Sequence, residues 1–439
     1  MKRVALISLG CAKNLVDSEV MLGALKRSGY SFVGSPEAAD IIIVNTCGFI
    51  RPARDEAEQA LEDALVIKHR DPRKKIIVAG CYVESDEKRL RRLYPAVDAW
   101  TGVRSFDRIC EVLDGSPLPR PDRTFLYSDR TPRLVSTPGT WAYIKVSEGC
   151  PHRCGFCSIP LIKGPYVSRR MASIVREARA LAGLGVKELN LVSHDTTYFG
   201  RDRGIKNGLV KLLERLIRVD GIEWLRFLYG YPEEITEPLL DIMSDGKVCR
   251  YLDIPFQHSD RKLVRAMRRG MDGAKALRLL YKIRARVPGV AIRTSLIVGF
   301  PGEGRREFHS LKRFVSEARF DHLGVFTYSA EQGTASCELP ETVGAEEKED
   351  RRAEIMALQA DLSLARNRSH IGQVLDVLVE GPASPKNHIL AARTRFQAPE
   401  VDGETFISLP RGRAGVPPAI VKAEILSAGS YDLHGRLVT

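Results

Sequence analysis

Residues 148–157 read Glu-Gly-Cys-Pro-His-Arg-Cys-Gly-Phe-Cys, which places three cysteines in one short loop with the spacing C-x3-C-x2-C. The apolar run Ala142–Val146 lies just before this loop and is typical of a β-strand. Three thiolates on such a loop can hold a cubane iron–sulfur cluster by three corners and leave the fourth iron open. By analogy with zinc proteins, an open metal position indicates a catalytic site. Cys150, Cys154 and Cys157 therefore predict a catalytic cluster that could pass an electron to a bound substrate.

Two other interpretations of this spacing stay open at this point. The loop could be a zinc knuckle, with His152 or a distant residue as the fourth ligand. The spacing could also arise by chance. The chain has nine cysteines, and in a reducing compartment their spacing indicates metal or redox chemistry rather than disulfides.

The sequence around the loop, from about residue 140 to 334, alternates strand-like runs with helical patterns. Strands that alternate with helices favour a parallel sheet. Six such units are too few to close an eight-stranded barrel, so we expect an open, partial (βα)6 barrel. The predicted strands are Ala142–Val146, Glu188–Val192, Leu225–Tyr229, Tyr251–Ile254, Ala291–Val298 and Asp321–Tyr328.

The rest of the chain predicts flanking domains, and so a multidomain α/β protein. Residues 1–116 alternate short strands with amphipathic helices and predict an open parallel α/β sheet. The proline-rich stretch 117–138 predicts a linker, and residues 139–369 would form the central domain. Residues 370–439 lose the helical period and predict a small antiparallel β-barrel. Its predicted strands are Gln373–Glu380, Thr405–Ser408 and Ala419–Leu426.

Three further cysteines recur at nearly regular spacing in the N-terminal region. Cys11, Cys47 and Cys81 are 36 and 34 residues apart, about the length of one βα repeat. Each follows an apolar strand-like run and adjoins a glycine, which lets the backbone approach a bulky group. Because ligands of open parallel sheets bind beyond the carboxyl ends of the strands, the three thiols would converge there. The pattern predicts a second three-thiolate cluster; three small buried core residues are the alternative.

Composition restricts the class of protein. The chain has 439 residues, of which 44% are hydrophobic and 28% charged, and this balance excludes disordered, collagen-like and disulfide-scaffold proteins. No apolar run approaches the roughly 20 residues that cross a bilayer, and the first residues are not typical of a signal peptide. We therefore expect a cytoplasmic protein that does not contact the membrane. A net charge of +12 permits an acidic partner such as nucleic acid or the ribosome.

The Cys150 loop, with an aromatic residue before its last cysteine, resembles the signature of the radical S-adenosylmethionine superfamily. A three-cysteine α/β domain, then this domain, then a TRAM-like β-barrel is the order found in methylthiotransferases, and the chain is most similar to their RimO type. The resemblance covers nearly the whole chain. Besides the loop, the motifs that carry it are Ser8–Glu19 (SLGCAKNLVDSE), Asn45–Ile50 (NTCGFI), Asp195–Gly200 (DTTYFG), Tyr229–Thr236 (YGYPEEIT), Tyr251–His258 (YLDIPFQH), Ile297–Glu303 (IVGFPGE) and Ala398–Gly403 (APEVDG).

The resemblance implies an enzyme that replaces a C–H bond with C–SCH3, using S-adenosylmethionine and two 4Fe–4S clusters. The cluster of the Cys150 loop would cleave S-adenosylmethionine to a 5′-deoxyadenosyl radical. The cluster of the N-terminal cysteines would carry the sulfur, which a second S-adenosylmethionine methylates. The radical would abstract a hydrogen from the β-carbon of an aspartate in small-subunit ribosomal protein S-twelve, either as the free protein or on the ribosome. A reductant such as flavodoxin or ferredoxin and a monomeric state are also expected.

The other site candidates rest on position alone. Asp195 and Asp253 fall at the carboxyl ends of strands, where barrel active sites form, so a catalytic role competes with capping or packing. Lys163 and Arg169 follow the cysteine loop and could meet the carboxylate of the cofactor, or be solvated surface residues. The glycines after the fifth central strand, Ala291–Val298, could line a cofactor. A plain strand-to-helix turn would explain them equally well. The candidates for cofactor binding are Phe156, Gly299, Gly302 and Glu303.

Two alternative functions remain. MiaB-like enzymes, which are close relatives of the family, modify an adenosine in tRNA instead. Residues 370–439 contain seven basic and seven acidic side chains, and RNA affinity depends on cations that contact phosphates, so a neutral barrel favours a basic protein as the partner. A non-enzymatic, zinc-containing RNA-binding protein is the other alternative, with both cysteine sets structural.

Overall fold

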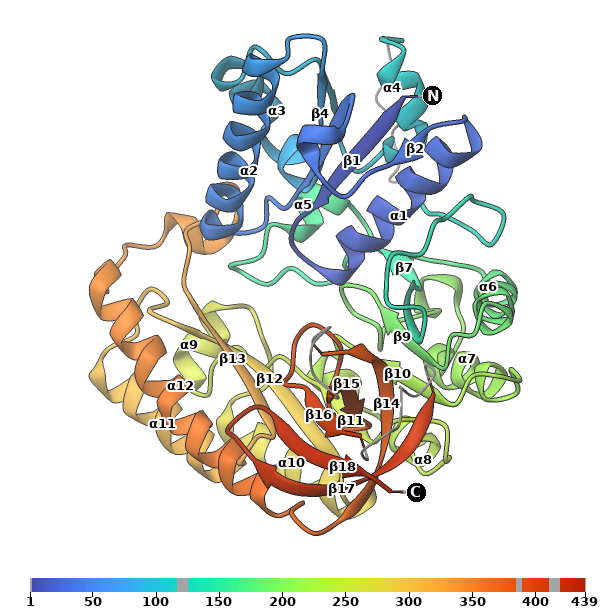
Figure 1. Ribbon diagram of the computed structural model, residues 1–439. Coiled ribbons are helices and arrows are strands. Elements are labelled where there is room, and N and C mark those ends of the chain that lie inside the picture. The colour runs from blue at the N-terminus through green and yellow to red at the C-terminus, as the bar shows by residue number, and fades with distance from the viewer. Residues whose placement is uncertain (1, 117–124, 384–388, 410–418, 439) are drawn as a thin grey trace.

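The computed structural model describes residues 2–116, 125–383, 389–409 and 419–438. Figure 1 shows an N-terminal α/β unit in blue and cyan, a central unit from green to orange, and a small barrel in red. The expected multidomain α/β architecture is confirmed. The first part of the predicted linker, at 117–124, and three basic residues of the C-terminal region (Lys386, Arg411 and Arg413) lie outside the described residues. Within the described ranges, no helix is both long and apolar enough to cross a membrane.

Five parallel strands form the N-terminal sheet, in the order β2-β1-β3-β4-β5. The central strand is rich in isoleucine and buried along its whole length, as expected for a parallel sheet covered on both faces. In this order β1, β3 and β4 are neighbours, so their carboxyl ends meet at one edge of the sheet. The elements are β1 (Arg3–Ser8), α1 (Ala12–Arg27), β2 (Ser31–Phe32), β3 (Ile41–Thr46), α2 (Arg51–Arg70), β4 (Lys75–Gly80), α3 (Cys81–Leu93), β5 (Ala99–Thr101) and α4 (Ile109–Leu113).

Six parallel strands form the partial barrel of the central unit, as predicted. The first three strands pair with one another, as do the last three, and a bridge between Leu225 and Val248 joins the two groups. Strands and helices share one apolar core. The strands are β6 (Trp141–Lys145), β9 (Glu188–Val192), β10 (Trp224–Phe227), β11 (Tyr251–Asp253), β12 (Ala291–Val298) and β13 (His322–Thr327), with a short pair β7 (Ser147–Glu148) and β8 (Val167–Ser168). The helices are α5 (Ile159–Lys163), α6 (Met171–Gly183), α7 (Gly208–Ile217), α8 (Glu237–Ile242), α9 (Arg261–Ala266), α10 (Gly273–Arg286), α11 (Arg305–Ala318) and α12 (Ala345–Arg368).

The C-terminal sheet closes into a barrel in the order β14-β15-β16-β18-β17. Its neighbouring strands pair antiparallel except for β16 and β18, which pair in parallel. The structure therefore differs from the expected antiparallel barrel at this one pairing. Closing the sheet removes its edges. The strands are β14 (Val374–Pro382), β15 (Ile389–Thr394), β16 (Thr405–Ser408), β17 (Ile420–Ala428) and β18 (Leu433–Leu437).

The described part of the predicted linker, residues 125–138, packs against both neighbouring units. Arg133 pairs with Glu19 of α1 and with Glu177 of α6, each at 2.6 Å. The Leu134 N–H donates to the Glu19 carbonyl at 2.9 Å. This stretch therefore fixes the N-terminal unit to the central one, while the domain boundaries themselves stay predictions.

The C-terminal barrel is anchored at the amino ends of the central strands. Glu188 begins β9, and its carboxylate accepts hydrogen bonds from Arg226 of β10 at 2.8 Å and from Arg393 of β15 at 2.7 Å. All three side chains are buried. The barrel thus covers one end of the central unit and leaves the carboxyl ends of its strands to the cysteine loop.

We expect Glu188→Ala to destabilise the protein by about 3–5 kcal/mol, because it leaves the buried Arg226 without its carboxylate. Urea unfolding of the purified protein measures this loss. Glu223→Ala is the matched control, since its carboxylate is half exposed and lies 3.6 Å from Lys187; it should cost less than about 1 kcal/mol. Equal effects of the two substitutions would contradict the anchoring role.

Candidate active site

The three cysteines of the central loop lie beyond the carboxyl end of β6, and two glycines let the loop pack closely. Gly149 has a φ of +73°, and a Cβ at this position would lie 2.1 Å from the Pro165 carbonyl oxygen. The Gly155 N–H donates to the Met267 carbonyl at 2.8 Å, and the Gly155 carbonyl accepts from the Ser336 N–H at 2.8 Å. The loop is therefore held by two distant segments of the central unit.

The cysteines of this loop are partly buried. Burial raises the pKa of Cys150 and of Cys157 to about 12. The Arg269 guanidinium lies 3.8 Å from the Cys154 sulfur and donates to the Pro255 carbonyl at 2.6 Å. A cation beside a thiol favours the thiolate that metal ligation requires. Arg269 lies among several other basic residues, and nothing in the sequence distinguishes it from them. It was therefore not predicted as a site residue.

His152 of the cysteine loop is paired with Asp195, which follows β9. The His152 Nε2 and an Asp195 carboxylate oxygen are 2.6 Å apart, and the imidazole stacks on Tyr231 with ring centroids 3.6 Å apart. The other carboxylate oxygen accepts from the Thr197 hydroxyl at 2.5 Å. Asp195 therefore positions the loop and engages Nε2 of the histidine that the zinc-knuckle alternative would use. Its catalytic role stays a prediction.

The cofactor-binding candidates gather around the turn after β12. Phe156 packs against an apolar cluster that borders this turn. The buried Glu303 carboxylate accepts from the Gly299 N–H at 3.0 Å and pairs with His258 at 3.3 Å and Arg351 at 2.6 Å. These contacts make Glu303 a support of the turn. The cofactor-binding roles of Phe156, both glycines of the turn and Glu303 stay predictions.

The structure places Cys11, Cys47 and Cys81 at the carboxyl ends of the neighbouring strands β1, β3 and β4. Cys11 precedes α1, Cys47 follows β3 and Cys81 begins α3. Gly10, with a φ of +88°, packs against Cys47: a Cβ here would lie 3.0 Å from the Cys47 sulfur. Burial raises the pKa of Cys47 to about 11 and of Cys81 to about 12, and mutual electrostatic interactions link the three thiols. The three side chains thus come together at one edge of the sheet.

Helix α5 connects the segment after the central cysteine loop to the N-terminal cysteine group. It follows Cys157 directly, and its Ile162 shares an apolar cluster with Cys81. The Ser158 hydroxyl lies 3.5 Å from the carbonyl of Phe49, two residues beyond Cys47. The junction of the N-terminal and central units therefore lies between the two groups.

A buried set of charges holds this junction. Lys163, the last residue of α5, pairs with Asp17 of α1 at 3.0 Å and with Glu148 at 3.6 Å. Lys145 also pairs with Asp17, and with Glu148 at 2.6 Å. Burial opposes ionisation of Glu148, but the two lysines outweigh it and lower its pKa well below the usual range. Two roles were left open for Lys163 by the sequence. The prediction that it is a solvated surface residue is wrong.

Arg169 is also buried and is paired with Glu177 of α6 at 2.7 Å. Its guanidinium lies 4.0 Å from the ring centroid of Tyr127 and donates to the Lys145 carbonyl at 2.9 Å. The alternative of a solvated surface role for Arg169 is therefore wrong as well. These contacts assign it to packing of the segment after the cysteine loop.

Each donor set has three thiols, the number that can hold a cubane cluster by three corners. Among the residues that the structure describes, no group of three or more His, Cys, Asp or Glu side chains is arranged to hold one metal ion. Lys13 and Lys163 lie where their charges favour the thiolates of Cys47 and Cys81, respectively.

Asp253, at the end of β11, has both carboxylate oxygens engaged by the protein. One oxygen accepts from Arg293 of β12 at 3.2 Å, and the other accepts from the Tyr229 N–H at 3.1 Å. Tyr229 has a φ of +62°, a left-handed conformation that is strained for a residue with a side chain. Asp253 thus positions Tyr229 at the mouth of the barrel, and its catalytic role stays a prediction.

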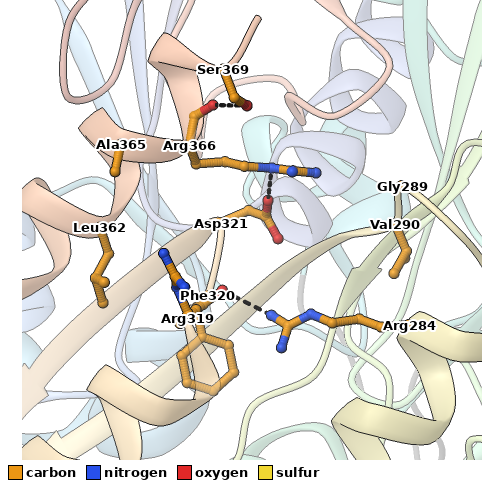
Figure 2. A pocket seen from close by; sticks show the side chains of 10 residues that line it. All are labelled: Arg284, Gly289, Val290, Arg319, Phe320, Asp321, Leu362, Ala365, Arg366 and Ser369. Carbon is orange, nitrogen blue, oxygen red and sulfur yellow. Dashed lines mark hydrogen bonds and ion pairs between the residues drawn. The ribbon is translucent and has the colours of Figure 1, made fainter.

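A hollow on the surface lies at the opposite end of the barrel, beside the amino ends of β12 and β13. Figure 2 shows Arg284, Arg319 and Arg366 around Asp321, which pairs with Arg366 at 2.9 Å. The Arg284 guanidinium donates to the Arg319 carbonyl at 2.8 Å. Because barrel enzymes react at the carboxyl ends of their strands, this basic hollow is not the catalytic site.

Comparison with protein families gives one match for each unit. The model described as uncharacterized protein family UPF0004 matches residues 3–102, the radical SAM superfamily matches residues 144–315, and the TRAM domain matches residues 371–438. The assignments of the central unit and of the C-terminal barrel are confirmed. The N-terminal match carries no functional description.

Curated relatives extend over the full chain. Proteins named ribosomal protein uS12 methylthiotransferase RimO are 44% identical in an Anaeromyxobacter species, 42% in Solibacter usitatus and 41% in Aquifex aeolicus. In each case 99% of this chain is covered, together with 93%, 95% and 97% of the relative.

Solved structures confirm the fold of the core. The radical S-adenosylmethionine methyltransferase TsrM from Kitasatospora setae, with tryptophan and a cofactor analogue bound, matches with a TM-score of 0.55 at 14% identity, covering 74% of this chain and 73% of that chain. The cobalamin-dependent enzyme OxsB matches in its apo form with a TM-score of 0.51 at 12% identity, covering 72% and 52%. At these identities the likeness concerns the fold alone.

Proposed function

The chain belongs to the RimO family of radical S-adenosylmethionine methylthiotransferases, and on this premise we propose that it attaches a methylthio group to the β-carbon of an aspartate in ribosomal protein uS12. Two 4Fe–4S clusters and S-adenosylmethionine would be its cofactors. When bound, one cluster supplies the electron that splits S-adenosylmethionine into methionine and a 5′-deoxyadenosyl radical, and the other supplies the sulfur that is transferred.

The adjacency of the two cysteine groups carries this proposal. The group at 150–157 would hold the radical-generating cluster, and the N-terminal group would hold the second one. A carbon radical must meet its sulfur before another donor quenches it, and proximity on one protein provides the effective concentration. The contact of Ile162 with Cys81 joins the two loops over a short distance. The buried pairs of Lys163 with Asp17 and Glu148 then keep the distance fixed.

The charges of the C-terminal barrel support a protein substrate over tRNA. Each of the four basic side chains in the described part of the barrel already has a partner inside the protein. Lys422 pairs with Asp376 and Arg436 with Glu424. Arg393 is buried against Glu188, and Arg395 donates to the Gly246 carbonyl. These partners offset part of the positive charge that contact with RNA phosphates, which dominate RNA affinity, would need.

Mass spectrometry of uS12 and of tRNA from a deletion strain tests the substrate. We expect the methylthio group to disappear from the uS12 aspartate and to persist on tRNA, and the gene in trans should restore it. Loss from tRNA with uS12 unchanged would assign the chain to the MiaB-like activity. Zinc without iron or acid-labile sulfide in the purified protein would instead support the non-enzymatic alternative.

The remaining expectations belong to the same proposal. The protein would act in the cytoplasm as a monomer and take its electron from a flavodoxin or ferredoxin. Size-exclusion chromatography with light scattering measures the oligomeric state. Cleavage of S-adenosylmethionine driven by each reduced carrier identifies the electron donor.

A further inference from the structure

Lys13 reaches from the N-terminal cysteine group to the mouth of the central barrel. It stands two residues after Cys11 in the first turn of α1 and is only 4% exposed. Its ammonium nitrogen lies 3.4 Å from the ring centroid of Tyr229, which follows β10 at the carboxyl end of the central strands. The side chain thus begins in the N-terminal unit and ends at the mouth of the central barrel.

The electrostatic neighbours of Lys13 come from both units. Cys11 and Cys47 belong to the N-terminal unit. His194 and Asp253 belong to the central unit, at the carboxyl ends of β9 and β11. Lysine is ordinarily protonated at neutral pH, so one positive charge lies where the two proposed reaction partners would meet.

Within the part of the chain that the structure describes, no carboxylate forms an ion pair with Lys13. Its acidic neighbour Asp253 is engaged by Arg293 at 3.2 Å and by the Tyr229 N–H at 3.1 Å. Burying a cation without an anion is costly, and the face of an aromatic ring offsets only part of that cost. The thiolate of Cys47, which Lys13 favours, would offset a further part, and a ligand with a negative charge would offset the rest.

The position is also fixed in advance. The Asn14 N–H donates to the Cys11 carbonyl at 2.8 Å, and the buried Asn45 amide donates to the Asn14 carbonyl at 3.0 Å. These bonds tie the first turn of α1 to the end of β3. On the other side, Asp253 holds Tyr229 in its left-handed conformation. A ligand that binds here therefore meets an ammonium group that needs little reorganisation.

We propose that Lys13 binds the side-chain carboxylate of the aspartate that is modified. This inference rests on the proposed function and deepens it by naming the residue that selects an acidic side chain. The reacting β-carbon is bonded directly to the carboxylate carbon, so holding the carboxylate fixes that carbon at the mouth of the barrel, beside the N-terminal cysteine group. An adenine base carries no negative charge for this ammonium group, so the same contact favours an aspartate over an adenine as the reacting group.

Binding of two forms of purified uS12 to the anaerobically reconstituted enzyme tests the proposal. One form carries the target aspartate, and the other has asparagine in its place. A charge-assisted contact predicts that wild-type enzyme binds the aspartate form at least about tenfold more tightly. The Lys13→Met enzyme should bind the two forms about equally, and Lys13→Arg should retain part of the preference for the aspartate form. Lys74→Met is the matched control, because Lys74 is buried in the same unit and donates to backbone carbonyls; it should keep the wild-type preference.

The outcomes separate the possible failures. If wild-type enzyme modifies the aspartate form but Lys13→Met keeps the preference, the inference is overturned and the proposed function stands. If Lys13→Met loses iron or changes the reduction potential of a cluster while the preference persists, Lys13 serves the thiolates instead. If wild-type enzyme neither binds nor modifies either form, the proposed function is wrong, and the inference, which rests on it, is wrong too. Circular dichroism and iron content, with Lys13→Arg as a second variant, identify a variant that has failed to fold.

Discussion

Alanine in place of Cys11, Cys47 and Cys81 together is expected to abolish methylthio transfer while S-adenosylmethionine is still cleaved. The substitutions remove the proposed sulfur-carrying site but leave the loop at 150–157, which is held by Met267 and Ser336 of the central unit. Iron in the reconstituted protein should fall from about eight atoms to about four, as expected for two cubanes that lose one. Iron and sulfide analysis, 5′-deoxyadenosine formation and product mass spectrometry measure the three quantities separately.

A double Cys110→Ala and Cys337→Ala variant is the matched control for this experiment. Cys337 is exposed, and Cys110 lies beside the hydroxyl of Ser28, at the end of α1 opposite to Cys11. The double variant should keep about eight irons and full transfer. If the N-terminal triple variant also kept about eight irons, the second cluster would have to be bound elsewhere.

The longer strands of the two larger units were predictable because they are mostly apolar runs bounded by polar or glycine positions, whereas the short strands β2 and β5 were missed. The ranges predicted for β9 and β12 match the structure without a shift. The strands β15 and β18 were missed. The first has two alanines in its middle, and the second reads Leu-His-Gly-Arg-Leu, with a glycine at its centre. Both strands are formed by pairing inside the closed barrel, which overrides weak local propensity.

The positions of the six cysteines were predictable because strand order fixes which loop ends meet. The buried charges were not. Lys163 and Asp17 lie 146 residues apart, and each is an ordinary surface residue type by composition. One signal was present in the motif SLGCAKNLVDSE: the charged positions of α1 do not follow one helix face. Lys13, Asp17 and Glu19 are all buried, because α1 packs against two units at once.

Net charge was a useful but incomplete guide to the partner. The equal numbers of basic and acidic residues at 370–439 predicted a barrel without a strong positive electrostatic field. The basic side chains that the structure describes there each have a partner within the protein. The pairing itself depends on contacts that no count contains, such as Arg393 reaching Glu188 across 205 residues. Excess positive charge instead gathers elsewhere, for example in the hollow of Figure 2 around Arg284, Arg319 and Arg366.

Alanine in place of Cys150, Cys154 and Cys157 together is expected to reduce 5′-deoxyadenosine formation and methylthio transfer to background. Without the three thiolates, no iron is held where S-adenosylmethionine would bind, so no electron reaches its sulfonium group. About four irons should remain, because the N-terminal sheet has an apolar core of its own that supports its cysteines. The same anaerobic assays measure these outcomes, with the Cys110 and Cys337 double variant as the control.

The two triple variants together distinguish a shared site from two separate ones. Both should lose the product and both should keep about four irons, yet only the N-terminal variant should still form 5′-deoxyadenosine. This asymmetry follows because radical formation needs only the central loop, whereas transfer needs both groups side by side at the α5 junction. If the central variant retained 5′-deoxyadenosine formation, the loop at 150–157 could not be the radical source. If it lost all eight irons, the two groups would have to assemble as one unit.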